Sequence, residues 1–160
     1  MNNTWVYADP HFWHTNIIRY ADRPFKTVEE MNSALIKNHN NTVSKHDKVF
    51  ILGDFALADK EKTANIIQQL QGTLILIMGN HDQRSYKWWL EAGFDQVSKY
   101  PIVVDTYTIL SHEPIWIEIG DRYYNIHGHL HNYILDLNRY MNVCVETTDY
   151  KPINLDLIKI

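Results

Sequence analysis

Three short apolar runs, separated by segments long enough to form helices, restrict the fold of this chain more than any other feature of its sequence. The runs are rich in β-forming residues and cover residues 4–8, 48–52 and 73–78. Capping residues mark the segments between them, and we expect helices over about residues 28–43 and 59–70. Strands joined through helices pair in parallel with right-handed crossovers, so the sequence predicts a parallel sheet with helices packed against it.

The second half of the chain has a different pattern. A short helix is expected over about residues 85–92, and four strand-like runs follow it with turn residues between them, at residues 102–105, 107–111, 123–127 and 141–145. The whole pattern predicts an α/β protein in which a mixed sheet, or two packed sheets, is flanked by helices. A chain of 160 residues has the size of one domain, so we expect a single domain over residues 1–160.

Composition excludes several classes of protein. Hydrophobic residues make up 45% and charged residues 21%, which is typical of globular chains and not of disordered ones. The net charge of −4 has the wrong sign for a protein that holds long duplex nucleic acid by neutralising phosphates. The first residues lack a secretory pattern, no run approaches the ~20 apolar residues of a membrane span, and Cys144 is the single cysteine. We therefore expect a cytoplasmic protein without a membrane partner.

Polar motifs follow five of the expected strands at the point where each strand ends. In chain order they are Asp9-Pro10-His11, Gly53-Asp54, Gly79-Asn80-His81-Asp82, His112 and Gly128-His129-Leu130-His131. Because loops at the carboxyl ends of parallel strands meet at one edge of a sheet, we expect these side chains to form one site. Imidazole with carboxylate suits zinc, manganese, iron or nickel better than calcium or magnesium. The donors are also too many for one tetrahedral ion.

The motifs differ in how much information they carry. With each residue type at roughly 1 in 20, chance gives Asp-x-His about 0.4 times in a chain of this length, Gly-His-x-His about once in 50 such chains, and Gly-Asn-His-Asp about once in 1,000. Together and in order, the motifs resemble the five-block signature of the calcineurin-like metallophosphoesterase superfamily. The resemblance covers residues 9–131 and implies an αββα sandwich of two mixed sheets flanked by helices, with a dinuclear metal centre at the strand ends.

The resemblance also assigns a role to each motif residue. It implies a first metal site made of Asp9, His11, Asp54 and His131. It implies a second site made of Asn80, His112, His129 and the same Asp54, which would bridge the two ions. Two divalent ions about 3.5 to 4 Å apart can activate a water between them and hold phosphoryl oxygens during in-line displacement. Manganese is the favoured metal, with iron, zinc and nickel as alternatives.

The remaining histidines divide between chemistry and structure. His81 is left over from the ligand set, so we expect it to protonate the leaving oxygen, with Asp82 orienting its ring. The alternatives are that His81 only stabilises the transition state and that Asp82 caps the next helix. We expect His39 and His46 at the surface and His127 hydrogen-bonded in the core.

The segment of residues 9–25 further resembles a group of small bacterial and phage members of the superfamily. His14, Asn16 and Arg23 match that group, and the match implies that these three residues bind substrate. As alternatives, His14 and Asn16 are surface loop residues and Arg23 is a solvated charge.

The sequence thus predicts a metal-dependent phosphohydrolase that uses two divalent ions. A small chain leaves few residues for a cap over the site, and an open site favours a phosphodiesterase acting on a small phosphorylated substrate such as a nucleotide. Two alternatives remain open at this point. One is a nuclease for short or single-stranded nucleic acid, and the other is a non-enzymatic metal-binding scaffold of the same fold.

Overall fold

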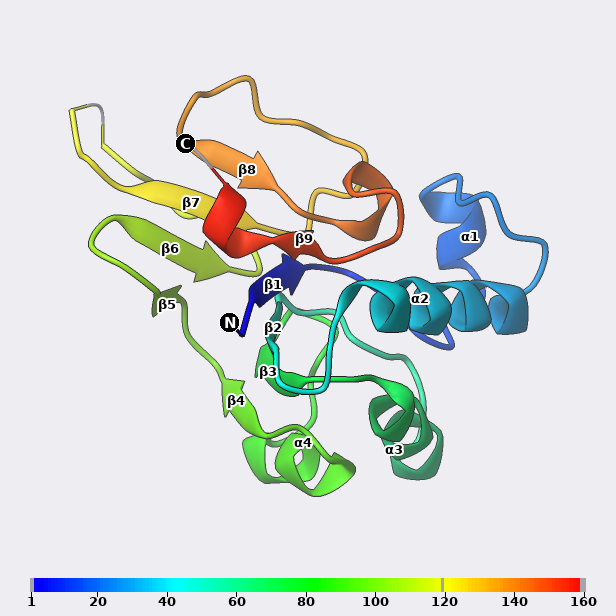
Figure 1. Cartoon of the computed structure of the whole chain (residues 1–160). Helices are drawn as coiled ribbons and strands as arrows, with labels where there is room; N and C mark the ends of the chain where they lie inside the picture. The colour runs from blue at the N-terminus through cyan, green and yellow to red at the C-terminus, as the bar shows by residue number, and fades with distance from the viewer. Residues whose placement is uncertain (1, 119, 159–160) are drawn as a thin grey trace.

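The computed structural model describes residues 2–118 and 120–158, which form two packed β-sheets and a set of helices (Figure 1). The larger sheet has the strand order β4-β3-β2-β1-β9. Its strands are β1 (Thr4–Tyr7), β2 (Lys48–Ile51), β3 (Thr73–Ile77), β4 (Gln96–Ser98) and β9 (Ile153–Asn154). β1 to β4 run parallel and β9 is antiparallel to β1, so the expected parallel sheet is confirmed.

The smaller sheet comes from the second half of the chain and has the order β5-β6-β7-β8. Its strands are β5 (Ile102–Val103), β6 (Thr108–Ser111), β7 (Tyr124–His127) and β8 (Tyr140–Asn142). β6, β7 and β8 are parallel, and β5 is antiparallel to β6. Both sheets are therefore mixed, and their parallel strands present several carboxyl ends for a site.

The three longer α-helices of the described chain begin at capping side chains. α2 (Val28–Thr42) starts where Thr27 accepts a hydrogen bond from Glu30 N–H, and α3 (Lys60–Gln69) and α4 (Tyr86–Ala92) start at Asp59 and Ser85 in the same way. α1 (Ile17–Tyr20) is a single turn in the loop after β1. Among the described residues, no helix is long and apolar enough to cross a bilayer.

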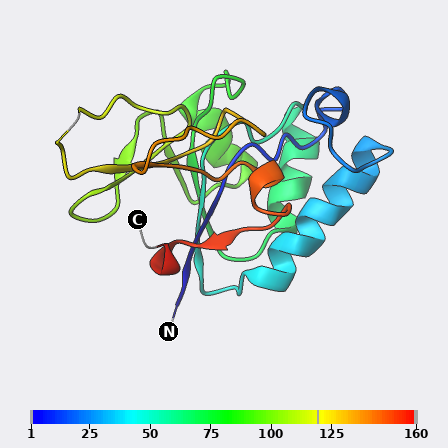
Figure 2. The ribbon, with the colours of Figure 1, turned by 90° about the horizontal axis from the view of Figure 1, so that it is seen from above.

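The large sheet separates two hydrophobic layers. In β2, Val49 and Ile51 point to the helices and share a buried cluster with Leu35 of α2. The alternate residue Phe50 points to the small sheet and shares a second cluster with Ile126 of β7. Figure 2 shows the helices and the small sheet on opposite sides of the large sheet. The expected fold class, two mixed sheets with flanking helices, is confirmed.

One expected strand, residues 141–145, is split. β8 ends at Asn142, and the chain then makes one bridge and enters the 3₁₀-helix η1 (Val145–Thr147). The Oδ1 atom of Asn142 accepts from Cys144 N–H (2.9 Å), and Thr147 Oγ1 lies 3.0 Å from Asn142 O. These side-chain hydrogen bonds accompany the end of β8 and the start of the 3₁₀ turn.

His39, which we expected at the surface, lies inside the protein. Only 1% of the residue is exposed, and its Nε2 atom donates to the carbonyl oxygen of Gln71 at 2.8 Å. Burial lowers the pKa of His39 to about 4, against the smaller opposing effect of this hydrogen bond. The neutral imidazole therefore ties α2 to the turn that leads into β3.

Candidate metal centre

The loops that follow β1, β2, β3, β6 and β7 come together at one edge of the two sheets. β1 is joined there to the small-sheet segment, because Ala8 N–H donates to Val143 O (2.8 Å) and Val145 N–H donates to Ala8 O (3.0 Å). Two groups of His and Asp side chains lie at this edge, and within each group the ligand atoms lie within 4.8 Å of one another. The motifs therefore converge in the folded chain.

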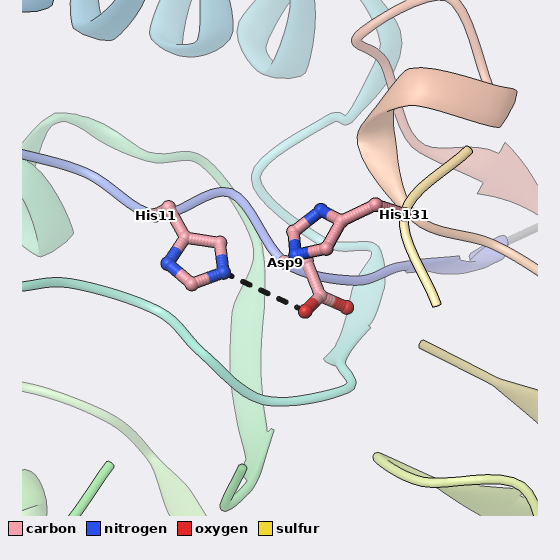
Figure 3. Close-up of side chains that lie close together, drawn as sticks. All are labelled: Asp9, His11 and His131. Carbon is pink, nitrogen blue, oxygen red and sulfur yellow. Dashed lines mark ion pairs between the residues drawn. The ribbon is translucent and has the colours of Figure 1, made fainter. Parts of the chain in front are cut away.

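The first group consists of Asp9, His11 and His131 (Figure 3). Asp9 and His11 are in the loop after β1, whereas His131 is in the loop after β7. The Nε2 atom of His11 lies 3.7 Å from Oδ1 of Asp9, and the His11 and His131 rings are 5.3 Å apart. One carboxylate and two imidazoles form a donor set suited to manganese, iron or zinc.

The second group consists of Asp54, His112 and His129. The Nε2 atom of His112 lies 3.2 Å from Nδ1 of His129 and 2.8 Å from Oδ1 of Asn80. Asn80 is thus in place to add a neutral oxygen to this group. The four side chains come from the loops after β2, β3, β6 and β7.

Asp54 lies between the two groups. Its Oδ2 atom is 3.5 Å from Nε2 of His11, and its Oδ1 atom is 3.6 Å from Nε2 of His112. Each carboxylate oxygen therefore faces one group. This is the arrangement that a bridging carboxylate needs.

Two buried polar atoms of the first group lack a hydrogen-bond partner among the described residues: Oδ1 of Asp9 and Nε2 of His11. The other oxygen of Asp9 is occupied, because Oδ2 accepts from His129 N–H (2.8 Å) and from the Cys144 thiol (3.2 Å). Leaving buried polar atoms unpaired costs free energy, and a cation between them removes that cost. These atoms fit a divalent metal ion.

The protonation states of Asp9 and His11 also suit a metal. Burial raises the pKa of Asp9, but the nearby His11 and His112 imidazoles and the hydrogen bond from His129 N–H together outweigh burial and lower it overall. Burial lowers the pKa of His11 more than the neighbouring carboxylates raise it. An ionised carboxylate and a neutral imidazole are the forms that bind metals.

Five residues of the two groups have a backbone conformation that residues other than glycine rarely adopt. Their φ angles fall between 47° and 68°, and they are Asp9, His11, Asp54, His129 and His131. Such conformations cost of order 1–3 kcal/mol each and persist where the surroundings hold them. The loops are thus fixed in a shape that aims the ligands inward.

Two motif glycines allow close approach to the carboxylates. A Cβ atom on Gly79 would collide with Oδ1 of Asp54, and one on Gly128 would collide with Oδ2 of Asp9. These two positions therefore require glycine because any side chain would collide with a ligand carboxylate, independently of backbone flexibility.

His81 stands at the open side of the site. Its side chain is 51% exposed, and its Nε2 atom lies 4.0 Å from Oδ2 of Asp54. Its backbone N–H donates to Oδ1 of Asp54 at 2.9 Å, so the loop is anchored while the ring stays accessible. Among the motif histidines, which all lie in the described part of the chain, His81 is the exposed one.

Asp82 does not orient His81, which corrects our expectation. Its carboxylate is buried and accepts hydrogen bonds from the backbone N–H groups of Asp54 (2.7 Å), Phe55 (3.0 Å) and Gly79 (2.9 Å). Burial, with the nearby charge of Asp54, raises the pKa of Asp82 to about 7 despite these donors. Asp82 thus fixes the loop that carries Asp54.

The substrate-binding residues expected from residues 9–25 occupy different places. His14 lies in the site, with its Nδ1 atom 3.2 Å from Nδ1 of His11, and burial lowers its pKa to about 4. Asn16 is exposed at the start of α1. Arg23 is neither solvated nor open to a substrate, because its side chain is buried. The structure thus corrects the expected substrate contact for Arg23.

One carboxylate at the site was missed from the sequence. The side chain of Glu146 in η1 is buried, and its Oε1 atom lies 2.9 Å from Nδ1 of His131 and 2.7 Å from Nη2 of Arg23. Burial raises the pKa of Glu146, but His131 and Arg23 together lower it below its usual range. Burial likewise lowers the pKa of His131, whereas Glu146 raises it overall. No motif spacing marks Glu146, so the sequence held no signal for it.

The fold and the two ligand groups define a protein with adjacent candidate sites for two divalent metal ions at the carboxyl edge of its sheets. The chain belongs to the calcineurin-like phosphoesterase family, whose model matches residues 3–158. The resemblance inferred from the motifs is therefore confirmed. Membership of this family makes the chain a hydrolase of the metallophosphoesterase type.

Several known proteins are similar to this chain. An uncharacterized protein of Methanocaldococcus jannaschii is 37% identical over an alignment of 177 positions that covers 99% of this chain and 90% of that protein. The Gene 66 protein of Mycobacterium phage L5 is 33% identical over 85 residues, 51% of this chain and 41% of that protein.

Two solved structures share the fold. A protein of unknown function from Aquifex aeolicus has a TM-score of 0.77 and 27% identity, with 96% of each chain covered. The nuclease MPE from Pseudomonas putida has a TM-score of 0.56 and 22% identity, with 80% of this chain and 61% of that chain covered. At that identity the second likeness shows the fold alone.

Proposed function

We propose that this chain is a metal-dependent phosphodiesterase that works with two divalent cations, of which manganese is the favoured one. The observation that carries the proposal is the position of Asp54, which presents one carboxylate oxygen to His11 and the other to His112. Imidazole and carboxylate donors accept several divalent metals, and manganese suits the carboxylate and amide oxygens among these donors.

The candidate ligand side chains divide into two metal sites. Asp9, His11 and His131 would hold one cation, His112, His129 and Asn80 the other, and Asp54 both. When bound, the cations supply Lewis acidity, which lowers the pKa of water and offsets the charge of a phosphoryl group. The neutral amide of Asn80 keeps the positive charge at the second position from being cancelled by a further carboxylate.

His81 acts on the leaving group in this proposal. Its side chain is half exposed, whereas those of His11 and His112 are 4% and 5% exposed. A protonated imidazole within hydrogen-bond reach of the ester oxygen can donate a proton as the bond to phosphorus breaks. The buried imidazoles have no such access to a departing group.

A hollow of about 320 Å³ lies on one side of the loop that carries Asn80 and His81. It is lined by Asn80 and His112 of the second group, and also by Lys99 and Tyr100. A cationic amine and an aromatic ring beside the ligands can receive one ester arm of an anionic substrate.

A second hollow, of about 310 Å³, lies at the other end of the same loop. It is lined by His81, Arg84 and Trp88, and the guanidinium of Arg84 lies 5.7 Å from the Trp88 ring centroid. One hollow borders the candidate ligands Asn80 and His112 and the other borders His81, and two such hollows suit a substrate with two ester arms. This is our reason for preferring phosphodiesters to phosphomonoesters.

The test compares hydrolysis of bis(p-nitrophenyl) phosphate with that of p-nitrophenyl phosphate. Protein stripped of metal and given Mn²⁺ should cleave the diester faster than the monoester, and chelator should stop both reactions. The matched control is the His112→Ala variant prepared in the same way, which should have little activity. A monoester preference would contradict the assignment as a diesterase, and activity that survives chelation would contradict the metal-dependent mechanism.

A nuclease for short or single-stranded nucleic acid is the second candidate. Trp88 favours it, because this half-buried ring lines the second hollow and bases of any sequence stack on accessible aromatic faces. The net charge of −4 argues against long duplexes. Cleavage of a short single-stranded oligonucleotide, weakened in Trp88→Ala while bis(p-nitrophenyl) phosphate is still hydrolysed, would favour this reading.

A non-enzymatic scaffold is the remaining alternative. Two bound metal ions without turnover of any phosphoester would support it.

We also place the protein in the cytoplasm. Cys144 supports this assignment, because its thiol is free and buried and donates a hydrogen bond to Asp9 that oxidation of the thiol would remove.

A further inference from the structure

Glu146 connects two parts of the first ligand group that are far apart in the sequence. Its side chain is 1% exposed, and its Oε1 atom accepts from Nδ1 of His131 at 2.9 Å. Because Nδ1 is occupied by this hydrogen bond, Nε2 is the nitrogen that His131 can offer to a cation. A carboxylate that holds the far nitrogen of a ligand histidine fixes both its tautomer and its ring orientation.

The same oxygen of Glu146 also holds Arg23. It accepts from Nε (2.9 Å) and Nη2 (2.7 Å) of Arg23. The guanidinium in turn donates to the carbonyl oxygens of Asp9 (2.7 Å) and Pro10 (2.8 Å). Glu146 is therefore linked through Arg23 to the backbone of the turn that carries Asp9 and leads to His11.

This turn needs to be held. Asp9 and His11 have φ angles of 57° and 51°, a conformation that costs free energy for residues other than glycine. The two hydrogen bonds from Arg23 fix the carbonyl groups of Asp9 and Pro10 in that conformation. Without Glu146, the buried guanidinium would lose the carboxylate that balances its charge.

We propose that Glu146 is a positioning residue for one metal ion only, the ion held by Asp9, His11 and His131. It fixes His131 directly and the Asp9 turn through Arg23, whereas its hydrogen bonds reach none of the side chains of the second group. The inference depends on the proposed function only in requiring that the two groups bind divalent cations.

The test measures Mn²⁺ binding to protein stripped of metal, by calorimetry and by electron paramagnetic resonance. Wild-type protein should bind two ions and give the spectrum of a magnetically coupled pair. Glu146→Ala should weaken one of the two sites by about 10- to 100-fold and leave the other within about twofold. At Mn²⁺ concentrations that fill both wild-type sites, the variant should then give the spectrum of an isolated ion.

Glu146→Gln separates shape from charge. Its amide oxygen can still accept from His131 and Arg23, so the affinity of the weakened site should lie between those of wild type and Glu146→Ala. This second variant also preserves the proposal's test if Glu146→Ala folds poorly.

Asp47→Asn is the matched control for a purely structural effect. Asp47 is also a buried carboxylate with side-chain and backbone donors, among them Trp5 Nε1 at 2.9 Å, but it precedes β2 at the opposite edge of the sheet. Asp47→Asn should lower thermal stability without changing either Mn²⁺ affinity.

Each outcome has a separate meaning. Two unchanged sites in both Glu146 variants would overturn the role of Glu146 and leave the proposed function standing. Equal weakening of both sites, or the same loss in Asp47→Asn, would show a general structural effect and overturn the inference. A wild-type protein that binds no Mn²⁺ would overturn the proposed function together with this inference.

Discussion

At the scale of single residues, the site is determined by the atom that each ligand side chain leaves free. Asp9 has one oxygen hydrogen-bonded to His129 N–H and to Cys144, and the other oxygen faces His11. His112 donates from Nδ1 to Leu52 O at 2.8 Å, which leaves Nε2 for a cation. The surrounding hydrogen bonds thus orient the ligands before any metal binds.

Asp54→Asn should abolish turnover. The substitution replaces one ligand oxygen by an NH₂ group and removes the charge set between the two cations, so we expect a loss of at least about 100-fold in kcat and fewer than two Mn²⁺ per chain. The measurement is steady-state hydrolysis of bis(p-nitrophenyl) phosphate with metal analysis of the same sample. Asp149→Asn, at an exposed position, is the control. A fully active Asp54→Asn enzyme would disprove the shared-carboxylate arrangement.

His81→Ala should keep both metals but slow the reaction. Loss of a general acid typically costs about 10²- to 10⁴-fold, and the cost should be larger for a diester with a poor leaving group than for p-nitrophenolate. The measurement compares kcat of wild type and variant for two diesters, one with a poor leaving group and one that releases p-nitrophenolate. The exposed His46→Ala provides the control. An equal loss for both leaving groups would instead indicate transition-state stabilisation without proton transfer.

At the scale of elements, the site is built from strand ends and the loops that follow them. β1, β2 and β3 are parallel neighbours, so the loops that carry Asp9, Asp54 and Asn80 begin side by side. Glycines then allow the loops to approach the carboxylates closely. The position of each ligand is thus a property of the pairing register as well as of its own loop.

Gly128→Ala should disturb the first metal site. The added Cβ would collide with the Asp9 carboxylate and with Ala8. We expect Mn²⁺ to bind with about 10-fold or greater loss at that site, measured by calorimetry. Gly120→Ala serves as the control, since a Cβ there meets nothing within 4 Å although φ is +105°. Equal Mn²⁺ affinity in Gly128→Ala and wild type would contradict the close approach.

The buried His39, which links α2 to the turn before β3 by a hydrogen bond, should make the free energy of unfolding depend on pH. The pKa of His39 is about 4 in the folded chain and ~6.5 when unfolded, so the unfolded chain binds more protons between these values and stability falls as the pH drops through this window. When the pH is lowered from about 7.5 to 5, His39 should lower the free energy of unfolding by about 2 kcal/mol.

Urea unfolding with chelator present, for wild type and His39→Gln, measures this contribution. The other titrating groups are common to both proteins, so the difference between them isolates His39. The wild type should lose about 2 kcal/mol more than the variant over this pH interval. Parallel losses would show that His39 titrates normally.

The strands with continuous apolar runs were predictable, but the short elements were not. β1, β2 and β3 match their expected positions within a residue or two because each run is buried on both faces. β4 and β9 have two or three residues of mixed character, which leave no periodicity to detect. α1 is one turn long and is likewise below what a repeat of 3.6 residues can reveal.

The same distinction applies to the site. Candidate ligands in dense motifs could be predicted because several rare residue types stand together, as in Gly79–Asp82. Arg23 stands in residues 9–25, a segment that the sequence does single out. Its partner Glu146 lies 123 residues further along the chain and has no local pattern, so the sequence does not show that the two act together. Asp82 was found but given the wrong role, since the sequence cannot show which backbone N–H groups its carboxylate meets.

At the scale of the whole molecule, two divalent cations would offset the formal charge of −4. The cations would also lie beside the buried carboxylates of Asp9 and Asp54, which are both close to the His11 imidazole. Metal binding should therefore be coupled to the stability of the fold.

Mn²⁺ should raise the melting temperature of protein stripped of metal. At about 100 times the dissociation constant, each site adds about 2.7 kcal/mol, and two sites correspond to a shift of about 10 to 20 °C for a chain of this size. Calorimetric melting with and without Mn²⁺ measures the shift. The His112→Ala variant should show a smaller one. A melting temperature independent of Mn²⁺ would mean that the groups do not bind the ion in the folded state.

Anomalous X-ray scattering from crystals grown with Mn²⁺ would locate the two ions themselves. We expect two peaks about 3.5 to 4 Å apart, one among Asp9, His11 and His131 and the other among His112, His129 and Asn80, with Asp54 next to both. A single peak, or peaks elsewhere in the molecule, would contradict this arrangement.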